Sequence, residues 1–157
     1  MSGLLMKNRI FQPFAGFAFL MLIVFMVAGY ARAAETNNLE PKHKVVIQVS
    51  SANPQVQTLA LNNASNLQQM LGMDNVKIVI VAYGPGLSIL TPKSIAPQRI
   101  QSLHAQGIEF DACHNTMLGV KRKTGHLPKL LAGVKVVPAG VVRIMELQQQ
   151  GWSYIRP

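Results

Sequence analysis

The chain has 157 residues, a single cysteine and a formal net charge of +9. Its length fits one domain with a real hydrophobic core, and a single cysteine excludes a disulfide framework within the chain. The bases are scattered apart from Lys121-Arg122-Lys123. We therefore interpret the charge as a solvated basic surface and expect no nucleic-acid partner.

Residues 1–33 have the order of a secretory signal peptide, with a basic start, an apolar middle and a small-residue exit. Lys7 and Arg9 precede an apolar run over residues 14–30, and Ala31 and Ala33 stand where a signal peptidase requires small side chains. We therefore expect cleavage and a periplasmic or secreted protein. The apolar run also reaches the lower edge of the roughly 17–25 residues that cross a bilayer as a helix. An uncleaved leader is the alternative, and it is the only membrane contact that we expect.

After a polar, flexible lead-in over residues 34–43, the sequence predicts one domain over residues 44–157. Apolar, mostly β-branched runs predict strands at residues 44–50, 77–83, 108–112, 134–138 and 152–155. Helical spacing, caps and glycine stops predict helices at residues 54–71, 94–106, 127–131 and 139–150. Strands that alternate with helices favour βαβ units. The predicted fold class is thus α/β, a three-layer sandwich around a mainly parallel sheet of about five strands.

Two of these helices carry more specific expectations. The first is capped by Asn53, with Pro54 in its first turn. In the last, apolar side chains are expected together on one side of the helix: Val142, Ile144, Met145 and Leu147.

In an open parallel sheet, ligands bind beyond the carboxyl ends of the strands. Residues 50–53, 83–86 and 113–116 follow predicted strands, so we expect them on one rim. Gly84 and Gly86 let backbone amides approach a ligand there. The Gly84-Pro85-Gly86 segment lacks the third glycine of a dinucleotide motif and the Lys-Ser/Thr of a phosphate loop. A tight turn without a function is the alternative for this segment.

Cys113 allows three interpretations, and a disulfide bond to another chain is one of them. It follows a predicted strand, and Asn115 or Thr116 can cap the turn or helix that comes next. A thiol that faces free backbone N–H groups, with His114 and the bases at 121–123 nearby, has a lowered pKa and is nucleophilic. Unpaired cysteines are also among the most buried residues, so an inert core thiol is the alternative.

Other chemistries find less support. Cys113, His114 and Asn115 are consecutive, whereas papain-like catalysis requires a nucleophile, base and orienting group that meet in space. A metal site from Cys113 and the histidines at 104, 114 and 126 has no recognised ligand spacing, so we expect neither metal nor cofactor. Four acids show no pairing that suggests acid–base hydrolysis: Asp74, Glu109, Asp111 and Glu146.

Four segments together resemble the DsrE/DsrF-like family of small sulfur-relay proteins: residues 107–117, 136–141, 149–157 and the turn at 83–87. The resemblance extends over most of the domain, from about Lys44 to Pro157. It implies a flavodoxin-like α/β sandwich, association into trimers or hexamers, and sulfur carried as a persulfide on a cysteine. Cys113 is the only residue of this chain that fits that part.

The first functional hypothesis is therefore a sulfurtransferase-type carrier in which Cys113 accepts a sulfane sulfur from a donor protein or a small sulfur anion. His114, Asn115 and Thr116 would support the thiolate, and Gly84, Gly86 and Lys121 would bind or steer the donor. The second hypothesis is a non-catalytic binding or assembly module with Cys113 buried, whose basic rim binds a small anion or a partner chain.

Overall fold

The structure, a computed structural model, describes residues 40–157. The expected leader and residues 34–39 of the lead-in lie outside these residues. The described chain forms one sheet of five parallel strands in the order β4-β3-β2-β1-β5. The strands are β1 (His43–Val49), β2 (Val76–Ala82), β3 (Glu109–Cys113), β4 (Lys135–Val137) and β5 (Ser153–Ile155). The predicted α/β class with a mainly parallel sheet is confirmed.

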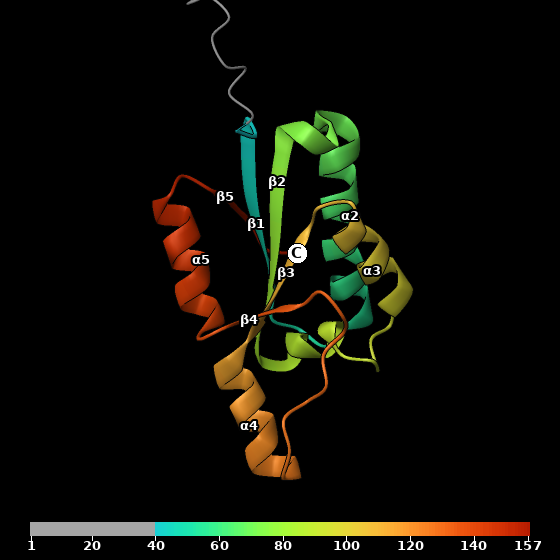
Figure 1. The fold of residues 1–157 in the computed structure, drawn as a ribbon, viewed down its shortest axis with the longest axis vertical. Helices are drawn as coiled ribbons and strands as arrows, with labels where there is room; N and C mark the ends of the chain where they lie inside the picture. Colours follow the sequence, from blue (N-terminus) through green and yellow to red (C-terminus); the bar gives the residue numbers. More distant parts are fainter. Residues whose placement is uncertain (1–39) are drawn as a thin grey trace, which may run out of the picture. The chain divides into compact units, whose positions relative to one another are not determined.

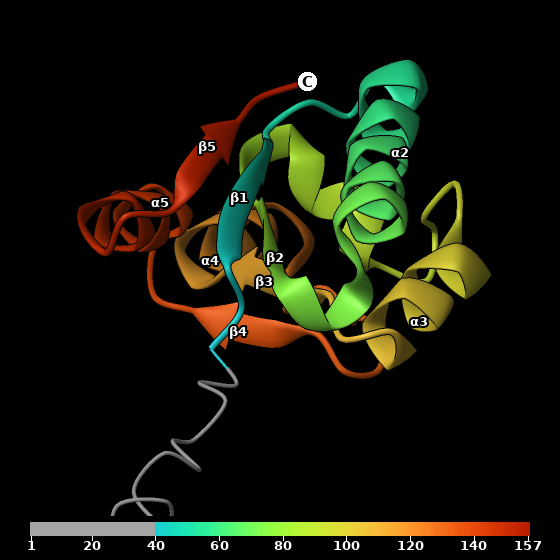
Figure 2. The same cartoon turned by 90° about the horizontal axis from the view of Figure 1, so that it is seen from above.

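Helices cover both faces of this sheet. They are α2 (Pro54–Leu71), α3 (Pro97–Ala105), α4 (His114–Thr124) and α5 (Gly140–Gln149), with 3-10 helices η1 (Met73–Asn75) and η2 (Gly84–Leu90). Figure 2 shows α2 and α3 on one face and α5 on the other. Alternate side chains of a strand point to opposite faces. Ile47 accordingly packs into the core under α2 and α3, and Val46 packs into the core under α5.

Local signals explain where α2 begins and ends. The Asn53 side chain accepts a hydrogen bond of 2.8 Å from the Gln55 N–H, and Pro54 occupies the first turn. Gly72 ends the helix with φ of 88°, a conformation that glycine adopts readily. The predicted helix over residues 54–71 is confirmed at both ends.

The parallel register places the carboxyl ends of three strands side by side. Val49 of β1 pairs with Ala82 of β2, and Ala82 pairs with Ala112 of β3. Gly86 lies so close to the end of β1 that a Cβ atom there would overlap the Val49 carbonyl oxygen. Only glycine therefore lets η2 fold back over this edge of the sheet.

One helix was predicted in the wrong place. Residues 127–131 are not helical, because the Leu131 N–H donates to the Leu90 carbonyl at 2.9 Å instead of to a carbonyl one turn earlier in its own segment. The helix of this region is α4, which begins directly after β3. Figure 1 shows α4 extending past the end of the sheet. It has one buried side chain, Met117, so the apolar periodicity that identifies a helix is nearly absent.

Two further expectations are corrected. Helix α3 begins at Pro97 rather than at Ser94, because the Ser94 N–H donates to the Thr91 carbonyl in a turn. In α5, Ile144 and Leu147 are buried, whereas Val142 and Met145 are 45% and 52% exposed. The apolar residues of α5 therefore extend over more of the helix surface than the sheet covers. No helix within residues 40–157 is long and apolar enough to cross a membrane.

Candidate functional site

Cys113 is the last residue of β3 and the N-cap residue of α4, and it is 5% exposed. Its side chain lies against the first turn of α5. A Cβ atom at Gly140 would stand 3.3 Å from Cys113 Cβ and 3.1 Å from Tyr83 Cβ. Gly140 is therefore the residue that lets the backbone of α5 approach the thiol closely.

Two helix N-termini meet at this thiol. Burial raises the pKa of Cys113, but four donors outweigh it, so the pKa lies below its ordinary value. The donors, in order of effect, are the Thr116 hydroxyl and the backbone N–H groups of Gly140, Thr116 and Asn115. The Asn115 N–H also donates to the Pro138 carbonyl at 3.2 Å, which fits its place as the weakest of the four. The arrangement stabilises a thiolate on Cys113.

Thr116 connects the thiol to the turn after β2. Its hydroxyl oxygen accepts a hydrogen bond of 2.9 Å from the Gly84 N–H, which leaves the hydroxyl proton for the Cys113 sulfur. Gly84 has φ of 53°, in the left-handed region where glycine is favoured. Thr116 thus connects the turn at Gly84 to the thiol of Cys113.

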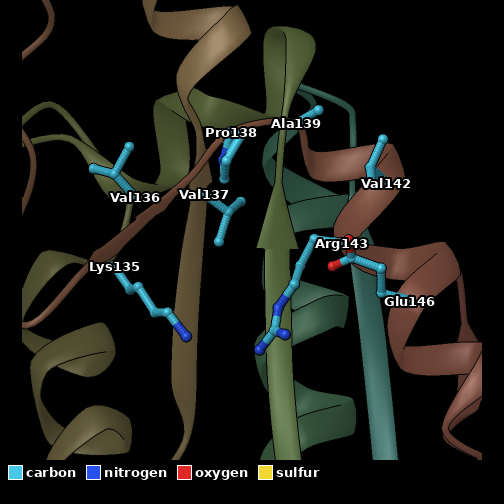
Figure 3. A pocket seen from close by; sticks show the side chains of 8 residues that line it. All are labelled: Lys135, Val136, Val137, Pro138, Ala139, Val142, Arg143 and Glu146. Carbon is cyan, nitrogen blue, oxygen red and sulfur yellow. The ribbon is translucent and has the colours of Figure 1, made fainter.

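A cluster of charges lies behind the thiol, on the same side of the sheet. Arg143 of α5 donates from Nε to Asp111 Oδ2 at 2.9 Å and from Nη2 to Glu109 Oε1 at 3.0 Å. Lys135 of β4 donates to the same Glu109 oxygen at 3.1 Å. Figure 3 shows the Arg143 and Lys135 side chains approaching β3 from opposite sides. Glu109, Asp111 and Cys113 alternate along β3, so they share one face of the strand.

The two carboxyl groups of this cluster differ in environment. Burial raises the pKa of Asp111 to about 6, and the neighbouring Glu109 charge adds to the rise against the opposing effect of Arg143. Burial also raises the pKa of Glu109, but its bonds with Lys135 and the nearby Arg143 bring it below the ordinary value. Asp111 is fully buried, and within residues 40–157 its Oδ1 atom has no hydrogen-bond partner.

Two cavities border the site. The α4 cavity, of about 530 Å³, is lined by Gly84, Pro85, Thr116, Gly119, Val120, Arg122 and Lys123. The α5 groove, of about 370 Å³, is lined by Lys135, Val136, Val137, Pro138, Ala139, Val142, Arg143 and Glu146. Figure 3 shows the α5 groove between β4 and α5. Cys113 lines neither cavity, but a neighbouring residue lines each: Thr116, in the first turn of α4, and Val137, which pairs with Cys113 in the sheet.

The structure brings several of the predicted site residues together. Cys113, Asn115, Thr116 and Gly84 share the hydrogen-bonded cluster. Asn115 and Thr116 lie in the first turn of α4 rather than capping it, because Cys113 is itself the N-cap residue.

The other predicted residues lie elsewhere. His114 is the half-buried first residue of α4, and Gly86 is buried against β1. Lys121 is exposed in the last turn of α4 and does not line the α4 cavity, whereas Arg122 and Lys123 do. Lys121 follows Thr116 by five positions, so it points to another side of the helix.

Sequence reasoning missed Gly140, Arg143 and the pairing of Glu109 with Asp111. The alternation of Glu109, Asp111 and Cys113 along a predicted strand was a signal for the acidic pair. Nothing local in the sequence indicated that Arg143 or the Gly140 N–H would meet β3. Within residues 40–157, no three His, Cys, Asp or Glu side chains are grouped as metal ligands would be.

A model of the DsrE/DsrF-like family matches residues 43–157, which is nearly all of the described chain. The chain belongs to the DsrE/DsrF-like family. Among solved structures, this family member is similar to MTH1491, a protein of unknown function from Methanobacterium thermoautotrophicum. The identity is 35% and the TM-score 0.66, over 73% of this chain and 99% of that chain.

A second similar structure is BT1422, a conserved protein of unknown function from Bacteroides thetaiotaomicron. Its identity is 16% and its TM-score 0.51, over 73% of this chain and 94% of that chain, so the likeness shows the fold alone. No curated protein matches this DsrE/DsrF-like chain. The resemblance of the sequence to this family is confirmed, and so is the flavodoxin-like α/β fold that it implied.

Proposed function

We propose that this DsrE/DsrF-like protein is an exported sulfur carrier, which accepts a sulfane sulfur on Cys113 and passes it to an acceptor thiol. In the first step the Cys113 thiolate attacks the terminal sulfur of a polysulfide. A Cys113–S–S⁻ persulfide forms, and the polysulfide leaves one sulfur shorter with the electron pair of the broken S–S bond. In the second step an acceptor thiolate attacks the outer sulfur of the persulfide, and the Cys113 thiolate returns.

The observation that carries this proposal is the position of Cys113, the N-cap residue of α4 beside the first residue of α5, where four donor groups lower the pKa of the thiol. The donors come from Thr116, Gly140 and Asn115, at the N-termini of α4 and α5. Anions are stabilised where free N–H groups and helix dipoles point at them. A thiolate and the terminal sulfur of a persulfide are both anions of this kind, so the same donors would serve both states.

The cellular setting of the proposal rests on other observations. Export rests on the order of basic, apolar and small residues over residues 1–33, which lie outside the described residues. We also propose a homo-oligomer, a trimer or hexamer by family resemblance. Three exposed apolar residues of α5 support a subunit contact: Val141, Val142 and Met145.

The test is to incubate the signal-free protein with tetrasulfide, remove the excess and measure the intact mass. We expect a gain of one sulfur atom on Cys113, and its loss when a small thiol acceptor is added. Cys113→Ser should remain folded and gain nothing. A wild-type protein that takes up no sulfur while its thiol reacts with iodoacetamide would overturn the proposal.

The exposure of Cys113, only 5%, favours a second candidate. In a non-catalytic binding or assembly module the thiol would be a core residue, and the basic rim would hold a small anion or a partner chain. This candidate predicts that the thiol does not react with iodoacetamide in the folded protein and reacts only in denaturant. The sulfur carrier predicts the opposite, because a thiolate held at helix N-termini needs only a small local opening to react.

A further inference from the structure

The two cavities on either side of the site, each lined by a neighbour of Cys113, differ in their charge. In the α5 groove, Lys135 and Arg143 are already paired with acids, and Glu146 adds a negative charge. The α4 cavity has Arg122 and Lys123 in its lining and no acid. Within residues 40–157, neither of these two cations forms an ion pair. The α4 cavity is therefore the positively charged one.

The face of α4 that lines this cavity has a glycine, which leaves open space in the cavity. Gly119 lies in the middle of α4, where glycine is less favourable than alanine. A Cβ atom at Gly119 would meet only Arg122 Nη2 within 4 Å, at an ordinary contact distance of 3.6 Å. Packing within the chain therefore does not require glycine at this position. The absent side chain instead adds to the open volume between Gly84 and Lys123.

Thr116 joins the cavity to the thiol. It lines the cavity, and it lies in the first turn of α4, whose N-cap residue is Cys113. Val120 and Pro85 supply apolar wall, which lowers the local dielectric and strengthens the attraction between a bound anion and the two cations. A small anion in the cavity would thus be held beside the reactive sulfur rather than at a remote surface.

We propose that the α4 cavity binds a small oxyanion that carries a sulfane sulfur, of the thiosulfate class, and presents it to Cys113. This inference rests on the proposed sulfur-carrier function and names its donor. Arg122 and Lys123 hold the sulfonate end, and the outer sulfur faces the thiol. The Cys113 thiolate attacks the outer sulfur, a new S–S bond forms, and the bond between the two sulfurs of thiosulfate breaks. Sulfite leaves with the electron pair, and the total charge is unchanged.

The experiment measures the rate of sulfur uptake by Cys113 from thiosulfate at several concentrations, by intact mass. The test variant combines Arg122→Gln with Lys123→Gln. The control variant combines Lys93→Gln with Lys129→Gln, which removes the same charge at exposed positions outside the cavity. At low thiosulfate the test variant should load roughly tenfold more slowly than wild type, and the control should load at nearly the wild-type rate. Alkylation by iodoacetamide, which is uncharged, should be the same in all three proteins.

Two further measurements test whether an anion binds in the α4 cavity. Sulfate, an unreactive dianion of similar shape, should slow loading from thiosulfate in wild type more than chloride does at equal ionic strength. Gly119→Leu places a good helix former at that position and fills the cavity, so it should slow loading while leaving α4 folded. Circular dichroism of this variant checks the fold.

The outcomes separate this inference from the function on which it rests. If wild type loads from tetrasulfide but not from thiosulfate, or if the test variant loads from thiosulfate as fast as the control, the donor site is wrong and the carrier function stands. If wild type loads from neither donor while iodoacetamide reacts, both are wrong. Slower loading of the test variant, with competition by sulfate and unchanged alkylation, supports the site.

Discussion

Asp111 and Arg143 join β3 to α5 through a hydrogen bond of 2.9 Å between Arg143 Nε and Asp111 Oδ2. Asp111 lies two residues before Cys113 on the strand, and Arg143 lies three residues after Gly140 on the helix. Both pairs therefore share a face of their element. The Asp111–Arg143 contact thus holds α5 in the position on the sheet that brings the Gly140 N–H to the thiol.

Arg143→Gln should weaken the thiol site as well as the fold. The variant leaves Asp111 buried without its cation, a loss that typically costs about 3–5 kcal/mol. We expect a lower free energy of unfolding in urea and a higher pKa of Cys113, measured as iodoacetamide alkylation against pH. Lys135→Gln is the control, because it removes a half-exposed partner of Glu109 and should cost less than about 1 kcal/mol. Equal effects of both variants on the thiol would count against the role given to Arg143.

Gly140→Ala tests the close approach of α5 to the thiol. The added methyl group would stand 3.1 Å from Tyr83 Cβ and 3.3 Å from Cys113 Cβ, so the first turn of α5 must shift by a few tenths of an ångström. We expect slower alkylation of Cys113 at neutral pH, because the Gly140 N–H moves away from the sulfur. Val141→Ala, at the next and exposed position, should leave the thiol pKa unchanged.

Thr116→Val removes the side-chain donor and keeps nearly the same volume. A hydrogen bond to a charged group contributes about 1.5–3 kcal/mol, so the thiolate fraction at neutral pH should fall roughly tenfold or more. The alkylation rate below the pKa of the thiol reports this directly. Thr116→Ser keeps the hydroxyl and should behave as wild type. A Thr116→Val protein with the wild-type pH profile would remove Thr116 from the site.

Asp111 should make the stability of the protein depend on pH in an unusual direction. Its pKa is about 6 in the folded protein against an ordinary value of 3.8, so folding takes up a proton between these pH values. Stability gained from this group is therefore present below pH 3.8 and is lost as the pH rises to about 6. We expect wild type to lose on the order of 2 kcal/mol relative to Asp111→Asn between pH 4 and 7 in urea unfolding.

Gly86→Ala tests the turn that closes the rim. The new Cβ atom would overlap the Val49 carbonyl and the Ser50 Cα, and neither backbone group can move without disturbing β1. We expect a loss of at least about 2 kcal/mol in thermal or urea unfolding. Gly107→Ala, where a Cβ atom meets nothing within 4 Å but φ is 90°, measures the cost of backbone strain alone. If Gly86→Ala costs no more than Gly107→Ala, η2 does not depend on this contact.

Much of the architecture can be predicted from short stretches of the sequence. The β-branched runs over residues 44–50 and 77–83 predict buried strands, and both β1 and β2 lie there. The Asn53 cap and Gly72 stop place α2 to the residue. The prediction failed where a helix has almost no core contact, since α4 buries only Met117 and its sequence lacks the usual apolar period.

The α/β class, the family and the rim on which Cys113, Thr116 and Gly84 meet all follow from the sequence, because the carboxyl ends of parallel strands share one edge. Which groups surround the thiol depends instead on how the helices pack on the sheet. The Gly140 N–H and the Arg143 guanidinium reach β3 because α5 packs on the face opposite α2 and α3. The same holds for Arg122 and Lys123, which line the α4 cavity where Lys121 does not. Contacts of this kind depend on how separate elements pack in space, and no short stretch of sequence encodes them.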